Sequence, residues 1–416
     1  MKNQNLKSID LINTKNKKNK LLVHGQGVYI FNYKEDSSYF YNFNDIMTDV
    51  IFTFYTNDKK DGLKVIFTKD NVNVIRLSDS KNLSDTNNNF GLTNKKGAYY
   101  WFSLDSQNQQ LYAGIGESRI ETKIYEYKFV FFSDDERKSN KQFLESLTYI
   151  KNNSKNITPI KLLRDPITMC VPLLIKNTDE LSLDDIARGF YLPKANLSII
   201  SQKLYDCICG EMFYLNSDDF PDFSDAIKYS IITEGKWCNT RLKEKSREFN
   251  KDKSNILETY LRITLGQNNG ESPGIPYVME IWPIGHYSPI HNHGNSNAII
   301  RVLHGSINVS LFPYLSEEKE TVEPFAITNF DKDDITWISP TLNQIHQLKN
   351  LEENTDTCIT IQCYMYDNED NSHYDYFDYR NKDGIKEPYE PDSDMDFISF
   401  KELIRKEWND IDILEF

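Results

Sequence analysis

The stretch GHYSPIHNHGNSNAIIRVLHGSINV, residues 285–309, holds four of the seven histidines in a chain of 416 residues. His291 and His293 are separated by one residue. On a β-strand they project to the same face, because side chains alternate with a period of two. Gly305 lies between two strand-like runs and fits a turn. The stretch therefore predicts a metal-binding strand followed by a hairpin.

A third histidine, His346, follows the strand-like run DITWISP and the short loop TLNQ. In a small β-barrel such a position can supply a third ligand. We therefore expect His291, His293 and His346 to converge on one metal ion. Two alternating histidines by themselves also occur on protein surfaces and in protein cores. The additional His346 is therefore what favours a metal site. His286 is assigned to a position that flanks the site, and His304 to a hairpin turn.

Composition narrows the class of protein. Hydrophobic residues make up 39% and charged residues 26%, as in soluble globular proteins. The net charge of -14 argues against a nucleic-acid or anionic-membrane partner. The sequence shows no membrane-length apolar run and no secretory signal at its start. We expect a cytoplasmic protein whose six scattered cysteines are reduced.

Five segments follow from the pattern of strands, helices and turns. Residues 1–20 are polar and predict a disordered tail. Residues 21–135 contain successive strand-like runs, such as VIFTFYT and GAYYWFSLD, and predict an antiparallel β-sandwich. Residues 139–255 predict a helical segment, with a capping-box signal in its sequence SLDD. Strands return in 256–370, and 371–416 predict an acidic linker and a C-terminal helix. The fold class is mainly β.

The region from about 180 to 370 resembles the cupins, and within them the cysteine dioxygenase family of thiol dioxygenases. The first cupin motif is matched by Gly285, His291, His293 and Gly305. The second retains His346 and Asn350. Asn343 stands where glycine is usual, and asparagine tolerates a left-handed backbone. The resemblance implies that residues 256–370 form a small cupin barrel, a jelly roll, with the helices from about 180 packed on it.

The resemblance also implies roles for residues around the metal. Arg262 is the expected binder of a substrate carboxylate, with Tyr260 beside it and Trp282 on the strand that leads into the metal motif. Tyr364 corresponds to the active-site tyrosine of the family. Gln362 stands where the family usually has histidine, so a hydrogen-bond relay along this strand would handle protons differently. Ala298 replaces the cysteine that crosslinks to the tyrosine in many animal members.

The metal implied is Fe(II). Standard cupins add a glutamate ligand shortly after the paired histidines, whereas HNHGNSNAIIR contains none. Three neutral imidazoles leave open coordination positions on the ion and do not balance its charge. A thiolate substrate can supply the negative charge and fill two positions with its sulfur and its amine, which leaves one position for dioxygen. The expected partners are a small thiol and O2. The expected reaction converts L-cysteine to cysteine sulfinate.

Three alternatives remain open at this stage. In the first, the substrate is another small thiol such as a mercaptocarboxylate. In the second, a zinc ion in the same site supports hydrolysis. In the third, the cupin binds metal without turnover and the N-terminal sandwich binds a glycan or a protein. The run GAYYWFSLDSQNQQLYAGIGE loosely resembles lectin-like modules, although a sandwich core requires the same alternation of aromatic residues.

Overall fold

The computed structural model divides the chain into two compact units, Met1–Cys170 and Val171–Phe416. Each unit is described by itself. The residues that the structure describes are 9–11, 25–33, 49–83, 90–92, 97–129, 132–152, 154, 157, 160–249, 252–266, 276–366, 377–389 and 392–410.

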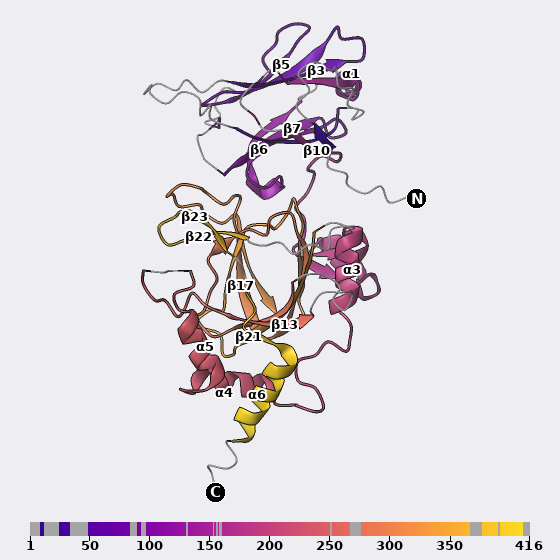
Figure 1. Ribbon diagram of the computed structural model, residues 1–416. Helices are drawn as coiled ribbons and strands as arrows, with labels where there is room; N and C mark the ends of the chain where they lie inside the picture. The colour runs from indigo at the N-terminus through magenta and orange to yellow at the C-terminus, as the bar shows by residue number, and fades with distance from the viewer. Residues whose placement is uncertain are drawn as a thin grey trace. The chain divides into compact units, whose positions relative to one another are not determined.

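The first unit consists of two antiparallel sheets, drawn in indigo to magenta in Figure 1. The larger sheet has the order β1-β10-β2-β6-β7-β8 and the smaller has the order β5-β4-β3-β9. Its elements are β1 (Ile9–Leu11), β2 (Gly27–Asn32), β3 (Val50–Thr56), β4 (Gly62–Phe67), β5 (Val72–Arg76), β6 (Tyr99–Asp105), β7 (Gln110–Ile115), η1 (Ile120–Thr122), β8 (Lys123–Lys128), α1 (Asp134–Glu145), β9 (Leu147–Asn152) and β10 (Ile160–Leu163).

Aromatic side chains from both sheets fill the core between them. Tyr29 on β2 stacks on Phe102 of β6 with ring centroids 4.6 Å apart, and Phe54 of β3 meets both rings edge-on. These side chains are almost completely buried. Aromatic pairs of this geometry add to the free energy gained by burying apolar surface. The predicted antiparallel β-sandwich is confirmed.

The sandwich extends further along the chain than 21–135. β9 pairs with β3 and β10 pairs with β2, so two strands from the segment 139–255 complete the sheets of the first unit. Both strands pair with strands that are distant in the sequence. A search for local helical patterns does not detect such pairings. In the tail 1–20, Ile9–Leu11 form strand β1 against β10 instead of being disordered. The other residues of that tail lie outside the described part.

The second unit contains the histidine-rich stretch. Its first half comprises β11 (Leu174–Lys176), η2 (Thr178–Glu180), α2 (Leu183–Arg188), β12 (Tyr191–Pro193), η3 (Lys194–Asn196), α3 (Ile199–Ile208), α4 (Phe223–Ile232), α5 (Trp237–Lys245), β13 (Leu261–Gly266), β14 (Tyr277–Trp282) and β15 (Ile290–His291). Its second half comprises β16 (Asn297–His304), β17 (Ser306–Leu311), β18 (Ala326–Asp331), β19 (Ile335–Ile338), β20 (His346–Lys349), β21 (Cys358–Met365), β22 (Phe377–Arg380), β23 (Lys386–Tyr389), β24 (Met395–Asp396) and α6 (Phe397–Asn409).

These strands form two sheets that pack face to face. One sheet has the order β12-β11-β19-β16-β21-β14-β13-β24 and the other has the order β18-β17-β20-β15-β22-β23. From β14 to β21 the chain passes from one sheet to the other at each step except between β17 and β18, which pair in the same sheet. Apolar side chains of both sheets, such as Trp282, Val302, Val309 and Leu348, pack in one cluster between them. The predicted mainly β fold class is confirmed.

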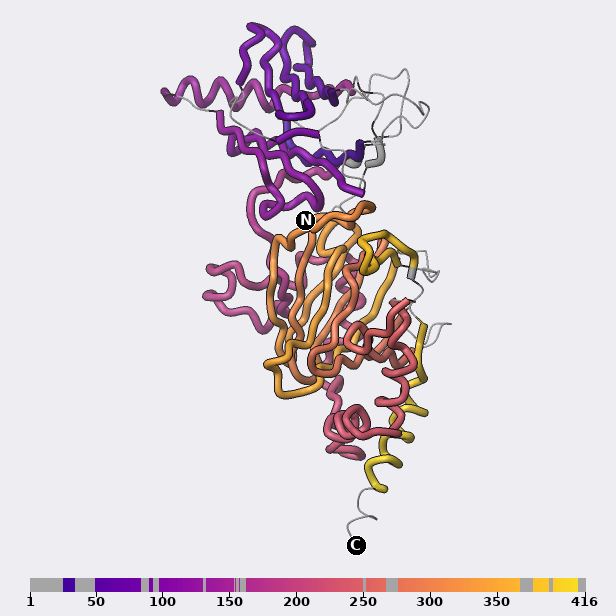
Figure 2. Tube along the Cα trace, turned by 90° about the vertical axis from the view of Figure 1, so that its left-hand side faces the viewer, coloured from indigo at the N-terminus to yellow at the C-terminus, as the bar shows by residue number. Residues whose placement is uncertain are grey.

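Helices cover the outer face of the larger sheet. Leu204 and Ile208 of α3 pack on Ile299 of β16 and Ile361 of β21. Helices α4, α5 and α6 form a second group on β13, β14 and β21, and Figures 1 and 2 show α6 running beside α4. Ser182 caps α2 through the predicted capping box. The sheet residues that face these helices are therefore apolar. The residues that face the other sheet are available for a functional site.

The segment 371–416 is more than a linker and a helix. Of its described residues, 377–389 form the hairpin of β22 and β23, and β22 pairs with β15, the strand that carries His291. β24 pairs with β13. The segment is rich in acidic residues and tyrosines, and a strand of two to four residues gives little periodicity. The sequence pattern therefore did not predict these strands. The C-terminal segment is part of the barrel.

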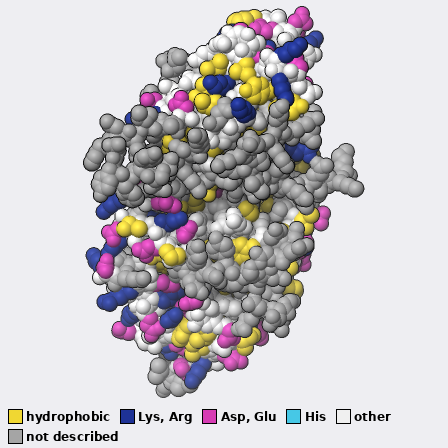
Figure 3. Space-filling model, turned by 45° about the horizontal axis from the view of Figure 1, so that its top comes forward, with side chains coloured by type: hydrophobic (Ala, Val, Ile, Leu, Met, Phe, Trp, Pro, Cys, Tyr) yellow, Lys and Arg dark blue, Asp and Glu magenta, His cyan; other side chains and the backbone are white. Residues whose placement is uncertain are grey.

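Within the described ranges, no helix has the length and apolar character needed to cross a membrane. All six cysteines carry free thiols, as the sequence predicts. Acidic and basic side chains are interspersed on the described part of the face shown in Figure 3.

Candidate metal centre

Three histidines converge inside the barrel of the second unit. His291 ends β15, His293 follows it, and His346 begins β20, directly opposite His291 in the antiparallel pair. The ring centroids lie 4.6 to 4.8 Å apart, and one nitrogen of each ring lies within 4.8 Å of the corresponding nitrogens of the other two. Such a triangle of imidazole nitrogens can surround one ion after a small adjustment of the rings.

Hydrogen bonds orient two of the rings for a metal. Nδ1 of His291 is 3.0 Å from the Pro289 carbonyl oxygen, and Nδ1 of His293 is 3.0 Å from the Gln344 carbonyl oxygen. Each Nδ1 therefore carries the proton it donates, which leaves Nε2 as the lone-pair donor for an ion. The residues present fit a divalent transition metal. Imidazole ligands suit Fe, Zn, Cu and Ni, so the donor set alone leaves the choice among them open.

Burial keeps these rings neutral. It lowers the pKa of His291 to about 4, and it lowers the pKa values of His293 and His346 well below 6.5. The second cause for His293 is the neighbouring His291, and for His346 the neighbouring His293. A neutral imidazole has a lone pair to donate, so the centre is ready to bind a cation at neutral pH.

Two left-handed residues shape the loops around the centre. Gly305, at the turn between β16 and β17, has φ +69°, and a Cβ there would lie 2.7 Å from the Thr357 carbonyl oxygen. Asn343, just before His346, has φ 63° and donates from Nδ2 to the Trp337 carbonyl oxygen at 3.1 Å. Asparagine therefore adopts the backbone conformation that the usual glycine would provide, as the sequence predicts.

Arg262 lies beside the centre and contacts a protein carboxylate. It is directly opposite Glu280 in the pair of β13 and β14. Arg262 Nε is 3.2 Å from Glu280 Oε1, and the two side chains are 2% and 8% exposed. Burial raises the pKa of Glu280, and the Arg262 charge opposes that shift. The arginine that the sequence assigns to a substrate carboxylate is thus already part of a buried ion pair.

A chain of hydrogen bonds runs along the inner face from β21 to this pair. The Tyr364 hydroxyl donates to Gln362 Oε1, and Gln362 Nε2 donates to Glu280 Oε2 at 2.5 Å and to Thr360 Oγ1 at 3.2 Å. Burial raises the pKa of Tyr364 well above 10. The tyrosine therefore stays protonated at neutral pH, and its ring stacks on that of His293 with centroids 5.7 Å apart.

Aromatic rings close the remaining sides. Tyr260 stacks on Trp282 with centroids 4.1 Å apart, next to Phe249. Phe377 of β22 packs on His293 with centroids 5.0 Å apart and also contacts Tyr364. These rings exclude water from the polar groups, and a lower local dielectric strengthens every charge interaction among them.

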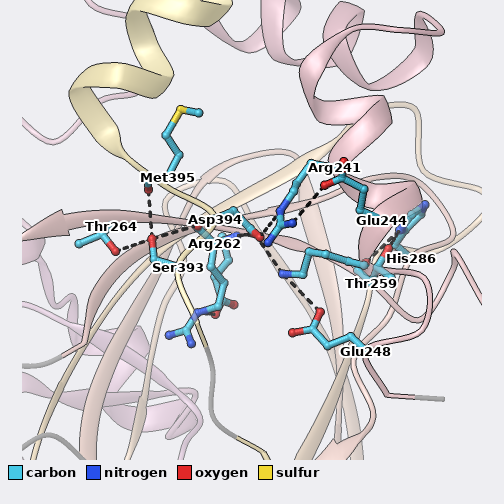
Figure 4. A network of polar contacts seen from close by, with 12 residues as sticks. Arg241, Glu244, Glu248, Thr259, Arg262, Thr264, His286, Ser393, Asp394 and Met395 are labelled. Carbon is cyan, nitrogen blue, oxygen red and sulfur yellow. Dashed lines mark hydrogen bonds and ion pairs between the residues drawn. The ribbon is translucent and has the colours of Figure 1, made fainter. Parts of the chain in front are cut away.

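A second buried carboxylate holds the strand that carries Arg262. Asp394, whose side chain is 1% exposed, accepts from Arg241 Nε at 2.9 Å and from Lys245 Nζ at 3.0 Å. It also accepts from the backbone N–H of Arg262 at 2.8 Å, while its own N–H donates to the Arg262 carbonyl oxygen (Figure 4). The C-terminal segment thereby fixes β13 beside the metal centre.

Two small cavities meet at the centre. The first, of about 20 Å³, is lined by Phe249, Tyr260, Arg262, Glu280, Trp282, Pro289, His291, His293, His346, Leu348, Gln362, Tyr364 and Phe377. The second, of about 30 Å³, is mostly apolar and is lined by Leu173, Ile300, Val302, Ile307, Val309, Leu311, Phe330, Thr336, Trp337, Ile338, Asn343, His346, Leu348 and Gln362. His346, Leu348 and Gln362 belong to both, so the polar and apolar cavities are neighbours.

No known protein family matches this sequence. Solved structures with some likeness include the cupin domain of Schizosaccharomyces pombe Cnp3, 12% identical over 26% of this chain and 64% of that chain, with a TM-score of 0.18. Hydroquinone 1,2-dioxygenase PnpCD in complex with Cd2+ and 4-hydroxybenzonitrile is 12% identical over 26% and 64%, with a TM-score of 0.19. L-Ribose isomerase of Geodermatophilus obscurus is 10% identical over 22% and 51%, with a TM-score of 0.17.

The chain thus spans between about half and just under two thirds of the length of these solved structures. Sequence identities and TM-scores this low do not show which chemistry the site performs. That chemistry is inferred from the residues of the site itself.

The structure brings the eight residues singled out from the sequence to one cavity: Tyr260, Arg262, Trp282, His291, His293, His346, Gln362 and Tyr364. His286 and His304 lie elsewhere; their Nδ1 atoms are bonded to the carbonyl oxygens of Thr259 and Thr357. Glu280 and Phe377 were missed. Glu280 stands two residues before Trp282 on one strand, so the alternation of side chains already places both on the same face.

Proposed function

We propose that this protein is an Fe(II)-dependent thiol dioxygenase that oxidises L-cysteine to cysteine sulfinate with O2. The observation that carries the proposal is a triangle of three neutral histidines with an arginine beside it and, among the described residues, no carboxylate grouped with the three rings. Three neutral ligands leave the full charge of a divalent ion to be balanced by an anionic substrate such as a thiolate.

The surrounding residues support this chemistry. Arg262 and its partner Glu280 provide a charged wall that can orient a small polar substrate. Tyr364 and Gln362 are hydrogen-bonded to each other and line the same cavity as the three histidines, so their hydroxyl and amide can hold a proton near the substrate sulfur. Bound iron would supply the activation of dioxygen. Overall, a thiolate and one O2 give one sulfinate, with both oxygen atoms and all electrons accounted for.

The two cavities match the two substrates. The apolar cavity suits dioxygen, because small apolar molecules enter dry apolar cavities. The other cavity brings the three histidines, Arg262 and Glu280 together, so it offers the polar groups that a small charged thiol needs.

The test begins with metal-free protein loaded with Fe(II) under anaerobic conditions. Oxygen uptake is then followed with L-cysteine, 3-mercaptopropionate, cysteamine and glutathione. We expect rapid uptake with L-cysteine only when iron is present, and none with Zn(II). Uptake fastest with 3-mercaptopropionate would make a mercaptocarboxylate the substrate. No uptake with any thiol, at full iron occupancy, would favour a cupin that binds metal without turnover and leaves function to a glycan or protein partner of the N-terminal sandwich.

A further inference from the structure

A single carboxylate lines the cavity that contains the three histidines. Among the described residues around this cavity, Glu280 is the only aspartate or glutamate. It lies on β14 with its side chain 8% exposed, and Arg262 Nε is 3.2 Å from its Oε1. A buried carboxylate in a candidate active site is a common general base.

A thiol that acts as an anionic ligand has to lose its S–H proton. The thiol of free cysteine has a pKa of about 8.5, so it enters the cavity protonated at neutral pH. The aromatic rings of Phe249, Tyr260, Trp282 and Phe377 line the same cavity and keep water away from it. The proton therefore needs an acceptor among the side chains that line the cavity.

The other titratable groups of the cavity cannot take up this proton. A metal-bound imidazole has no free lone pair, because its second nitrogen already carries a proton. The guanidinium of Arg262 is always fully protonated. A phenol keeps its own proton at neutral pH, and burial raises the pKa of Tyr364 well above 10. The carboxylate of Glu280 is the group that remains.

We propose that Glu280 is the general base of this site, whose carboxylate accepts the S–H proton as the thiol binds. The S–H bond breaks and leaves its electron pair on sulfur, and an O–H bond forms on Glu280, so no oxidant or reductant is needed. The net charge of the cavity is unchanged, because the negative charge moves from Glu280 to the sulfur. The inference rests on the proposed function and adds a catalytic residue to that site.

The contacts of Glu280 hold the carboxylate in place and still allow it to take up a proton. Oε1 is contacted by Arg262, and Oε2 accepts from Gln362 Nε2 at 2.5 Å. An ionised carboxylate offers about four acceptor positions, so a lone pair is left for the proton. Burial raises the pKa of Glu280, while Arg262 and Gln362 oppose that shift. A raised pKa brings the carboxylate closer to the thiol, which favours transfer between them.

Glu280 interacts electrostatically with titratable groups on three neighbouring elements: Arg262 of β13, Lys245 of α5 and Tyr364 of β21. The two positive groups favour the ionised carboxylate before a thiol binds. A thiolate in the same cavity then brings a second negative charge near Arg262, and two anions beside one arginine favour protonation of one of them. Glu280 is therefore ionised before binding and protonated afterwards.

Proton release on binding tests this role directly. The Zn(II)-loaded protein is titrated with L-cysteine by anaerobic calorimetry in buffers of different ionisation enthalpy, which gives the number of protons released per ligand bound. The parent keeps the S–H proton on Glu280. Glu280→Gln cannot accept it and should release about one more proton per L-cysteine than the parent. Its affinity should therefore rise with pH more steeply than that of the parent, by about a further tenfold per pH unit.

Two variants separate a base from a structural support. Glu280→Asp keeps a carboxylate and should release as few protons as the parent, even where its affinity is lower. Glu258→Gln removes a half-buried carboxylate outside the cavity and should leave the proton count unchanged. A structural role of Glu280 would change the affinity in Glu280→Gln without changing the number of protons released.

Infrared difference spectra provide a readout on the parent itself, so the inference stays testable if Glu280→Gln does not fold. Binding of L-cysteine to the Zn(II)-loaded parent should produce the C=O stretch of a newly protonated carboxyl group. The absence of this band, equal proton counts in the parent and Glu280→Gln, or a parent that does not bind L-cysteine would each overturn the inference.

Oxygen uptake by the iron-loaded parent is recorded separately. Retention of the proton on Glu280 without any uptake would refute the proposed dioxygenase and leave Glu280 as the base of a thiol-binding metal site. Uptake with L-cysteine and equal proton counts would support the dioxygenase and overturn the role of Glu280.

Discussion

His291 and His346 lie directly opposite each other in the antiparallel pair of β15 and β20, with ring centroids 4.8 Å apart. Their residue numbers differ by more than fifty, yet the register of two short strands brings both rings to one candidate metal site. β15 has only two residues and pairs on its other side with β22. The metal centre therefore depends on strands from well beyond the histidine-rich stretch.

Replacing His346 tests the ligand set. We expect His346→Asn to weaken Fe(II) binding by roughly a hundredfold or more, because one of three protein ligands is lost. His304→Asn is the matched control, since His304 lies outside the triangle and is bonded to the Thr357 carbonyl oxygen. Metal content after dialysis against a weak chelator gives the answer. Equal iron in the parent and His346→Asn would exclude His346 as a ligand.

Phe377 connects the C-terminal hairpin to the centre. Phe377→Ala should destabilise the protein by about 3 kcal/mol through the loss of a buried ring, and it should also weaken metal binding, because the ring packs on His293. Phe400→Ala truncates an equally buried ring in the helical cluster. It should lower stability similarly while metal affinity stays close to that of the parent. Chemical denaturation and metal titration of both variants make the comparison.

Arg262→Lys keeps a positive charge near Glu280 and removes the planar fork. A lysine cannot hold a carboxylate through two parallel hydrogen bonds, so kcat/KM for L-cysteine should fall roughly tenfold to a hundredfold. The iron content should be nearly unchanged. Steady-state oxygen uptake together with iron analysis measures both. Full activity in Arg262→Lys would show that the fork does not hold the substrate.

Tyr364→Phe removes the hydroxyl that donates to Gln362. We expect kcat to fall about tenfold, with the dissociation constant for L-cysteine changed by less than threefold, because general acid–base groups typically act on the chemical step. Tyr229→Phe, on helix α4 away from the centre, serves as the control. If Tyr364→Phe turned over as fast as the parent, its hydroxyl would have no part in the reaction.

Acidification should destabilise the metal-free protein through the buried histidines. His291 has a pKa of about 4 in the folded chain and an ordinary value of 6.5 when unfolded. Between these values the unfolded chain binds more protons, so stability is present above pH 6.5 and is lost as the pH falls toward 4. From pH 7 to pH 5, His291 contributes a loss of about 2 kcal/mol. Denaturation at both pH values should show a smaller loss for His291→Asn.

The sequence predicts the parts of this site that are set by local spacing. Alternation places His291 and His293 on one face, and Asn343 adopts the left-handed backbone expected of it. The pairing of Arg262 with Glu280 depends on the register of β13 and β14, which spacing does not determine. The strands after 371 escaped prediction because each is short and its partner is distant in sequence. Local patterns thus predict the ligands, and non-local registers complete the cavity.

The central claim is that the three-histidine centre adds both atoms of dioxygen to a cysteine sulfur. The most direct measurement incubates the Fe(II)-loaded protein with L-cysteine under isotopically labelled O2 and analyses the product by mass spectrometry. We predict cysteine sulfinate in which both sulfinate oxygens carry the label, formed by the parent and not by His346→Asn. Cystine as the sole product, or sulfinate whose oxygens come from water, would contradict the claim.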